Sequence, residues 1–376
     1  MSLRKILIGG LSFAGLALAS TSASAETRGY AIAQFMTATY ANPGNCPQGG
    51  NGTPTDLKVR ILMKDHGMTK DQALKAIEDG DKMPDGKRID FLRRGTINGK
   101  PADISNFPYS APDSKIETNV GKLGPGFNLD GKVDADDFED PDTHEKGIDN
   151  QLIRALGCFA VYDIRRPVRP YLEDITWDTN MDAMGAWLMS VTGDDLSKDG
   201  PVKITFDRAL NHLLRDAHGG AASDVTFMVD PNPRSHSEFQ GRIKDGYLEI
   251  TQHGDFTMLS EAPFHPIIQF SNTHLKLKMG ADRKLTGYLG GYEPWMNYYT
   301  FLAIRGEGTG QVDLPGSYYA IKRMADGVPD PKTGEMTAIS NAYWLEAVPA
   351  FHALSDGQIA GAKGSKDRDT EVAKAR

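Results

Sequence analysis

The chain has 376 residues, 39% of them hydrophobic, and a formal net charge of −8 at pH 7. This length allows one large domain or two ordinary ones, each with a core of its own. The acidic balance and the lack of a long basic run argue against a nucleic-acid partner, because phosphate neutralisation supplies most of the affinity for nucleic acids. They argue equally against docking on an anionic membrane surface.

The first 25 residues have the pattern of a secretory signal peptide. Arg4 and Lys5 precede an uncharged apolar run over 6–19, and Ala23-Ser24-Ala25 offers small residues at a cleavage site. The apolar run is shorter than the roughly 20 residues that a membrane span needs. We therefore expect cleavage after Ala25 and a soluble periplasmic or secreted protein without a membrane span. A retained N-terminal anchor is the alternative.

Cys46 and Cys158 are the two cysteines of the chain. In an oxidising compartment an even number of cysteines predicts pairing, and two cysteines allow one connectivity. Such a disulfide would close a loop of more than a hundred residues, a constraint worth about 4–5 kcal/mol in the chain-entropy model. The alternative is a reactive thiol, but the sequence places no base beside either cysteine.

Two helices are predicted in the N-terminal part of the mature chain. The first covers 70–79, where Thr69 and Gln72 have the spacing of a capping box. The second covers 150–156, with Asp149 as its N-cap. The segments between these helices are rich in Gly, Pro, Asn and Asp, which favours loops.

From about residue 186 the hydrophobic residues alternate with polar ones, which is typical of strands. The clearest hairpin covers 239–250 and turns on Asp245-Gly246, a dipeptide suited to a two-residue turn with positive φ. This register predicts two cross-strand pairs: Ile243 with Leu248, and Arg242 with Glu249.

The remaining pattern adds strands, one hairpin and one helix. Strands are expected at 186–191, 225–229, 266–270, 300–304 and 343–348, a hairpin joining 274–279 to 285–291, and a helix near 317–326. These elements predict a mainly β fold, an antiparallel sandwich or jelly roll with a loop-rich, partly helical N-terminal region. The expected regions are a signal peptide (1–25), a loop-rich disulfide-tied region (26–160), an antiparallel β-rich domain (161–356) and a disordered tail (357–376).

Residues 126–138 resemble a calcium-binding loop of the EF-hand or dockerin type, with Gly131 at the sharp turn. The resemblance implies a structural Ca²⁺ ion with these ligands: Asn128, Asp130, the backbone carbonyl of Lys132, Asp134 and Asp137. The loop departs from the pattern at its first position, where Gly126 lacks a carboxylate, and at its last, where Asp137 is shorter than glutamate. Calcium affinity would therefore be weak, or another ligand would have to come from elsewhere, such as Asp140, Asp142 or Glu145. A solvated acidic loop with an Asp-Gly turn is the alternative.

The sequence has no nucleophile elbow, no zinc-protease motif and no phosphate-binding glycine loop of correct spacing. Histidines beside aspartates, such as His212 and His218 around Asp216, most often make surface hydrogen bonds. No catalytic residue is therefore predicted, and the sequence leaves open whether the protein is an enzyme.

A run of aromatic residues is the candidate ligand site. Five aromatic residues stand among the twelve residues from 288 to 299, on a segment broken by glycine and proline. Rings with an apolar face and a polar edge suit sugars and other flat amphipathic ligands. The predicted ligand-binding residues are Tyr288, Tyr292, Trp295 and Tyr298. The alternative is that these rings cap one end of the core.

These observations favour an exported, calcium-stabilised protein that binds a small molecule or glycan through its aromatic-rich segment. Two other functions stay open. One is a secreted or periplasmic hydrolase on a jelly-roll scaffold that uses carboxylates. The other is a structural accessory protein of an envelope assembly, with a protein partner.

Overall fold

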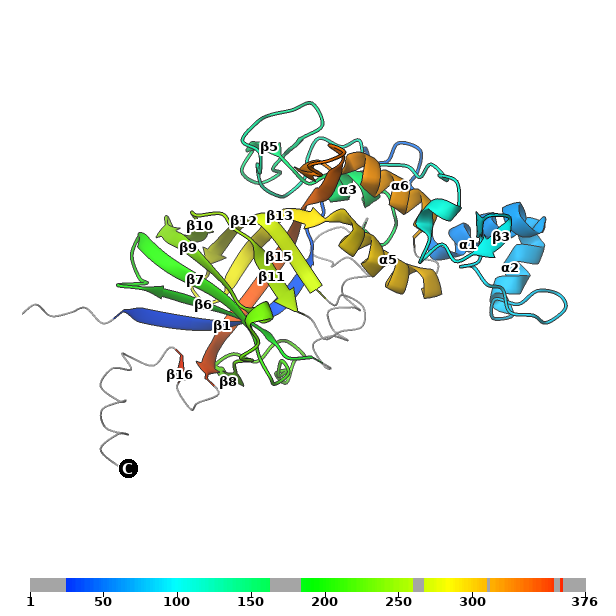
Figure 1. The fold of residues 1–376 in the computed structure, drawn as a ribbon. Helices are drawn as coiled ribbons and strands as arrows, with labels where there is room; N and C mark the ends of the chain where they lie inside the picture. Colours follow the sequence, from blue (N-terminus) through cyan, green and yellow to red (C-terminus); the bar gives the residue numbers. More distant parts are fainter. Residues whose placement is uncertain (1–24, 163–183, 260–266, 310–311, 355–358, 361–376) are drawn as a thin grey trace, which may run out of the picture.

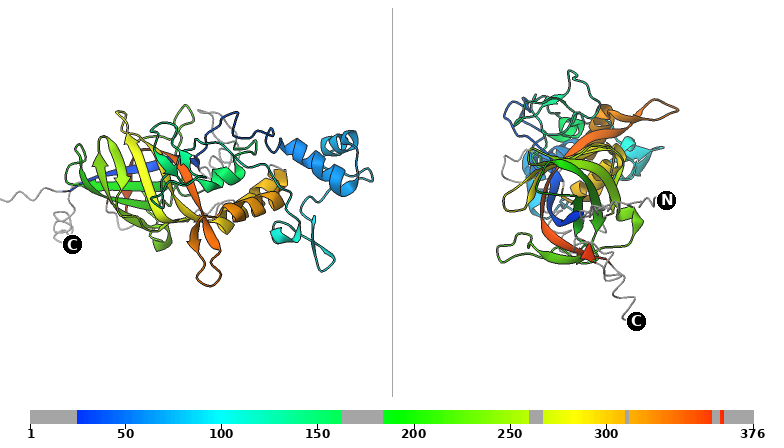
Figure 2. Two further views of the ribbon diagram at one scale, coloured as in Figure 1. Left: turned by 90° about the horizontal axis from the view of Figure 1, so that it is seen from above. Right: turned by 90° about the vertical axis from the view of Figure 1, so that its left-hand side faces the viewer.

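A computed structural model describes residues 25–162, 184–259, 267–309, 312–354 and 359–360. The predicted signal peptide up to residue 24 lies outside these residues, as does the predicted tail apart from Ile359–Ala360. A β-barrel occupies one end of the molecule and a pair of helices the other, with loops and further helices between them (Figures 1 and 2).

Eight antiparallel strands form the barrel and follow one another around it in chain order. They are β1 (Glu26–Thr37), β6 (Trp187–Gly193), β7 (Gly200–Arg208), β9 (Ser237–Lys244), β10 (Tyr247–Ile250), β12 (Ile267–Met279), β13 (Leu285–Pro294) and β15 (Met336–Ala353). The barrel closes because β1 pairs with both β6 and β15. The predicted mainly β, antiparallel class is confirmed. The sheet closes on itself, however, and is described as a barrel instead of a sandwich or jelly roll.

Side chains alternate across the barrel wall. Along β9 buried and exposed residues alternate at every position, and most of β7 follows the same pattern. Aromatic rings from several strands pack together inside. Phe35 stacks on Tyr343 with ring centroids 4.3 Å apart, and Phe206 meets Phe256 edge-on at 5.2 Å. All four belong to one core cluster, so the barrel interior is filled by side chains.

The predicted hairpin at 239–250 is confirmed as β9 and β10. Its register pairs Ile243 with Leu248 and Arg242 with Glu249, as the alternation predicts. Asp245 and Gly246 both have positive φ (52° and 77°), which a tight two-residue turn requires. The second predicted hairpin is confirmed as β12 and β13.

Shorter strands extend the barrel or form ribbons of their own. β8 (Val225–Met228), β14 (Gly327–Pro329) and β16 (Ile359–Ala360) pair with β15, and β11 (Phe256–Leu259) pairs with β12. The ribbons are β2 (Gly95–Ile97) with β3 (Lys100–Ala102), and β4 (Phe138–Glu139) with β5 (Lys146–Ile148). The predicted final strand at 343–348 is part of β15, which is much longer.

Three helices pack together where β13 ends and β15 begins (Figure 1). They are α3 (Gln151–Leu156), α5 (Trp295–Thr309) and α6 (Leu314–Met324). The helix predicted near 317–326 is confirmed as α6. The strand predicted at 300–304 is wrong, because these residues lie in α5. A short apolar run does not distinguish a buried strand from a buried helix.

The far end of the molecule holds α1 (Pro54–His66) and α2 (Lys70–Glu78). The predicted capping box of Thr69 and Gln72 is confirmed in α2, and Thr53 begins α1 in the same way. The two helices enclose a small second core that includes Leu62 and Ala73. Single 3₁₀ turns occur at Pro108–Ser110 and Pro233–Ser235. Among the described helices, none has the length and apolar character needed to cross a membrane.

Candidate functional site

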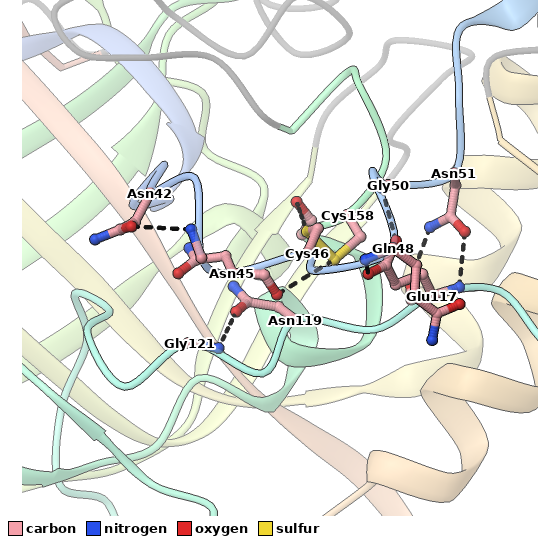
Figure 3. Close-up of a disulfide and its surroundings, with 12 residues drawn as sticks. Asn42, Asn45, Cys46, Gln48, Gly50, Asn51, Glu117, Asn119, Gly121 and Cys158 are labelled. Atoms are coloured by element: carbon pink, nitrogen blue, oxygen red, sulfur yellow. Dashed lines mark hydrogen bonds between the residues drawn. A yellow bond between two sulfur atoms is a disulfide. The ribbon is translucent and has the colours of Figure 1, made fainter.

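The predicted disulfide between Cys46 and Cys158 is confirmed (Figure 3). It ties the loop that follows β1 to the end of α3. Two backbone hydrogen bonds lie next to the disulfide. The Asn51 N–H donates to the carbonyl of Cys158 (2.8 Å), and the Val120 N–H donates to the carbonyl of Asn45 (2.9 Å). The bridge therefore joins segments that also contact each other through the backbone.

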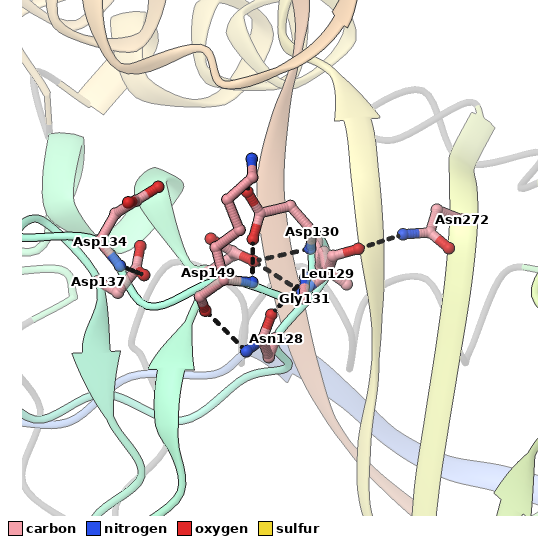
Figure 4. Close-up of polar contacts among 9 residues, drawn as sticks. Asn128, Leu129, Asp130, Gly131, Asp134, Asp137, Asp149 and Asn272 are labelled. Atoms are coloured by element: carbon pink, nitrogen blue, oxygen red, sulfur yellow. Dashed lines mark hydrogen bonds and ion pairs between the residues drawn. The ribbon is translucent and has the colours of Figure 1, made fainter.

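Three of the side chains proposed to bind calcium, those of Asn128, Asp130 and Asp137, bond to other residues of the loop itself (Figure 4). The side-chain oxygen of Asn128 accepts from the Gly131 N–H (2.7 Å), and its amide donates to the carbonyl of Lys132 (2.8 Å). Asp130 forms an ion pair with the Lys132 ammonium (2.8 Å), and Asp137 accepts from the backbone of Asp134. Within the described residues, no three His, Cys, Asp or Glu side chains are grouped so that they could hold a metal ion.

Asp149 does not cap α3 with its side chain, contrary to the sequence prediction. Its carboxylate accepts from the backbone N–H of Leu129 (2.7 Å), while Asn150 takes the N-cap position without a side-chain bond to the helix. Burial, with smaller contributions from the nearby carboxylates of Asp137 and Asp326, raises the pKa of Asp149 to about 7. Asp149 thus stabilises the acidic loop instead of the helix.

The acidic loop is docked on the outer face of β12. Asn272 stands where the register between β12 and β13 shifts, and its amide donates to the carbonyl of Leu129 (2.8 Å; Figure 4). Phe127 packs beside His274, whose ring stacks on His253 at 3.6 Å. Burial, with a smaller contribution from His253, lowers the pKa of His274 to about 4, so this imidazole is neutral at pH 7.

Calcium binding by this loop stays a prediction of the sequence. A cation that binds only the folded state raises the melting temperature by mass action. The prediction is a higher melting temperature in excess calcium than in EDTA, measured by circular dichroism. Asp130→Ala should abolish this difference and leave the disulfide intact. Equal melting temperatures of the parent protein in both buffers would exclude a tight structural calcium site.

Two of the four predicted ligand-binding aromatic residues lie at the base of α5. Tyr298 is fully buried, and its hydroxyl lies 2.8 Å from that of Tyr162 and 3.2 Å from that of Thr37. Trp295 begins α5, and its indole N–H donates to the carbonyl of Met336 (3.2 Å). These contacts join α5 to its neighbours.

The other two residues lie on the outer face of β13, four positions apart. The ring of Tyr292 packs so closely on the backbone of Gly327 that a Cβ there would lie 2.2 Å from it. Burial, followed by the nearby carboxylates, raises the pKa of Tyr292 above its usual range. Tyr288 lines a groove on the barrel surface. The structure therefore does not gather the four predicted residues into one site.

The groove that contains Tyr288 has a volume of about 520 Å³. One wall is the outer face of β9, β10, β12, β13 and β15, and the other is the acidic turn (residues 140–145). Tyr288 and Trp344 are cross-strand partners in the register of β13 and β15, so both side chains project from neighbouring positions on the outer face. Both side chains are half-buried. They form an aromatic floor that the sequence alone did not reveal.

Charged groups surround this floor. Lys276 is the cross-strand partner of Tyr288 on β12, and its ammonium lies 5.6 Å from the ring centroid of Tyr247. Lys278 lies one pair further along the same face and forms no ion pair with a described residue. Glu145 stands exposed on the opposite wall. The aromatic rings of the floor can therefore stack on a flat ligand, and the charged side chains around them can form hydrogen bonds with its hydroxyl or carboxylate groups.

Two lining residues, Tyr247 and Trp344, were missed by the sequence reasoning. Trp344 stands in the predicted strand 343–348, and period-two alternation places it on the face opposite Tyr343. The missing information was that β15 pairs with β13, which brings Trp344 beside Tyr288.

Comparisons of the chain with protein-family models, with curated proteins and with solved structures gave no match.

Proposed function

We propose that this protein binds a glycan, or another flat polar small molecule, in the groove on the outer face of its barrel. The observation that carries the proposal is the pair Tyr288 and Trp344, which lie side by side on an outward face and line a cavity of about 520 Å³. Export and calcium stabilisation belong to the same proposal, and the disulfide is compatible with an oxidising compartment.

The chemistry of the groove favours a sugar-like ligand. An aromatic ring gives a flat apolar face to the C–H groups of a sugar ring, and its edge tolerates water. Lys276 and Lys278 lie beside the rings and can donate hydrogen bonds to hydroxyl or carboxylate oxygens. Glu145 on the opposite wall can accept hydrogen bonds from hydroxyl groups. A few polar groups around an apolar floor are the usual composition of a small-molecule site.

The test is isothermal titration calorimetry of the full chain with three hexasaccharides: chitohexaose, cellohexaose and hexagalacturonate. We expect at least one to bind, and Trp344→Ala to weaken its affinity at least tenfold, because buried tryptophan anchors commonly contribute more than about 1.4 kcal/mol. Trp295→Phe is the matched control, since Trp295 lies outside the groove. The proposal fails if none of the three binds at millimolar concentration, or if Trp344→Ala binds like the parent.

A further inference from the structure

A separate cavity of about 250 Å³ lies between α1 and the segment 113–117, which we call the strap. Its charged lining residues are Arg60, Lys64, Arg94 and Lys115, together with Asp65 and Asp313. Arg60 and Lys64 are one helical turn apart on α1, so they lie on one face of the helix. In a chain with a net charge of −8, four cations around one small cavity are a local reversal of charge.

No close ion pair with a described carboxylate holds these four cations, although Arg60 interacts electrostatically with Asp56. A cavity of similar size at the opposite end of the molecule, beside β1, is different. Each of its cations is paired: Arg28 with Glu26, Arg283 with Asp224, and Lys284 with Glu346. The cations of the cavity beside β1 are thus held in close ion pairs, whereas those of the cavity beside α1 are not.

The two acids of the cavity do not restore neutrality. Asp313 is the N-cap of α6, and one carboxylate oxygen accepts from the Gly316 N–H (3.1 Å) and from the Ser114 hydroxyl (2.8 Å). The Asp313 carboxylate therefore already accepts hydrogen bonds from the first turn of α6 and from the strap. Asp65 is exposed on α1. Two negative charges face four positive ones.

The cavity walls are fixed by their own hydrogen bonds. The Arg60 guanidinium donates to the carbonyl of Asn51 (2.7 Å), and that of Arg94 donates to the carbonyl of Phe91 (2.9 Å). These bonds position the two guanidinium groups and leave further N–H donors on each of them. Holding these side chains in place before binding reduces the entropy that a ligand would otherwise have to offset.

The strap is anchored on both sides of Lys115. Beyond it, Glu117 exchanges two hydrogen bonds with Asn51 (2.7 and 2.8 Å; Figure 3). Before it, Asp113 pairs with Arg323 and accepts from the backbone N–H of Lys115 (2.8 Å). Lys115 itself has a backbone φ of +55°, a conformation that residues other than glycine rarely adopt. The anchored strap thus maintains this unusual backbone at the cavity.

We infer that this cavity binds a phosphate group, either inorganic phosphate or the phosphate of a small phosphomonoester. Guanidinium and ammonium donors that converge from different segments are the usual recognition chemistry of a compact dianion. The volume exceeds that of a few water molecules, at about 30 Å³ each, so a phosphate with a short carbon chain fits. The apolar lining residues Leu57 and Ile61 offer contacts to such a chain.

The test is calorimetric titration of the full chain with inorganic phosphate and, in a second arm, with glycerol 3-phosphate. We expect binding in at least one arm, with affinity that falls as NaCl is raised. Tighter binding of glycerol 3-phosphate identifies an organic phosphate, and equal affinities identify the phosphate group alone. No binding of either compound at 10 mM would overturn the inference.

Variants locate the site. Lys64→Gln and Lys115→Gln should each weaken phosphate binding about tenfold, since each removes one charged donor. Both side chains are exposed, so we expect folding to be preserved, and melting curves check this. Lys70→Gln, on α2 and outside the cavity, is the matched control and should bind like the parent. Binding that neither cavity variant weakens would place the phosphate elsewhere and overturn the inference. Trp344→Ala in the glycan groove should leave phosphate affinity unchanged, so the two proposals fail independently.

Discussion

Replacing both Cys46 and Cys158 with serine is expected to lower the free energy of unfolding by about 4–5 kcal/mol. The bridge joins residues 112 positions apart, and a cross-link over a loop of this length mainly restricts the unfolded chain. The measurement is urea denaturation of the parent and the double variant, followed by circular dichroism. The native fold should persist, because the backbone hydrogen bond from Asn51 to Cys158 also joins the two segments.

Reduction of the parent protein provides the control for this prediction. A thiol reductant should lower the denaturation midpoint of the parent to that of the double serine variant, and it should not change the midpoint of the variant. Hydrogen exchange should accelerate around Asn45 and Val120, next to the bridge, more than in the barrel strands. A midpoint that neither reduction nor substitution lowers would contradict the expected role of the disulfide.

Asp149→Asn is expected to stabilise the protein above neutral pH. The pKa of Asp149 is raised from 3.8 to about 7, chiefly by burial. Ionisation of this carboxyl group therefore costs more free energy in the folded protein than in the unfolded chain. The parent therefore loses stability as pH rises from about 4 to about 7. A shift of this size corresponds to about 4 kcal/mol. The amide is uncharged at every pH and can still accept from the Leu129 N–H.

The expected gain from Asp149→Asn is about 4 kcal/mol at pH 8 and about 1 kcal/mol at pH 4.5, measured by urea denaturation at both pH values. Asp130→Asn is the matched control from the same loop. Hydrogen bonds from Lys132 lower the pKa of Asp130, so its neutralisation should give no gain at pH 8. His274 has the opposite effect on the pH dependence, because its lowered pKa makes the fold less stable as pH falls. This effect is the same in the parent and in both variants. A gain independent of pH would contradict the assignment.

Elements defined by short-range chemistry could be predicted from the sequence. Asp245-Gly246 determines both the turn and the register of its hairpin, because only a few residue pairs adopt two consecutive positive φ angles. Thr69 and Gln72 are three residues apart and form their capping box without any help from the rest of the chain. The disulfide followed from the number of cysteines. In the turn and the capping box the interacting residues are close together in the sequence. For the disulfide, the presence of two cysteines leaves one possible pairing.

Features that depend on distant segments could not be predicted. Asp149 has the spacing of an N-cap, but its carboxylate accepts from Leu129, twenty positions earlier. Tyr298 and Tyr288 belong to one aromatic run, yet the first is a buried residue of α5 and the second lies on the barrel surface. The difference comes from the change from strand to helix at Trp295. An apolar pattern alone does not show which neighbour will cover a ring.

The pairing of β1 with β15 also constrains how the chain acquires its structure. Gly29 and Ala350 are register partners although more than 300 residues separate them. During synthesis β1 can pair with β6 first, but the edge of β1 that faces β15 stays unpaired until β15 has left the ribosome. Contacts of such long sequence separation form slowly, and an unpaired edge invites association with other chains. We therefore expect this edge of β1 to be a site of incorrect association with other chains until β15 becomes available.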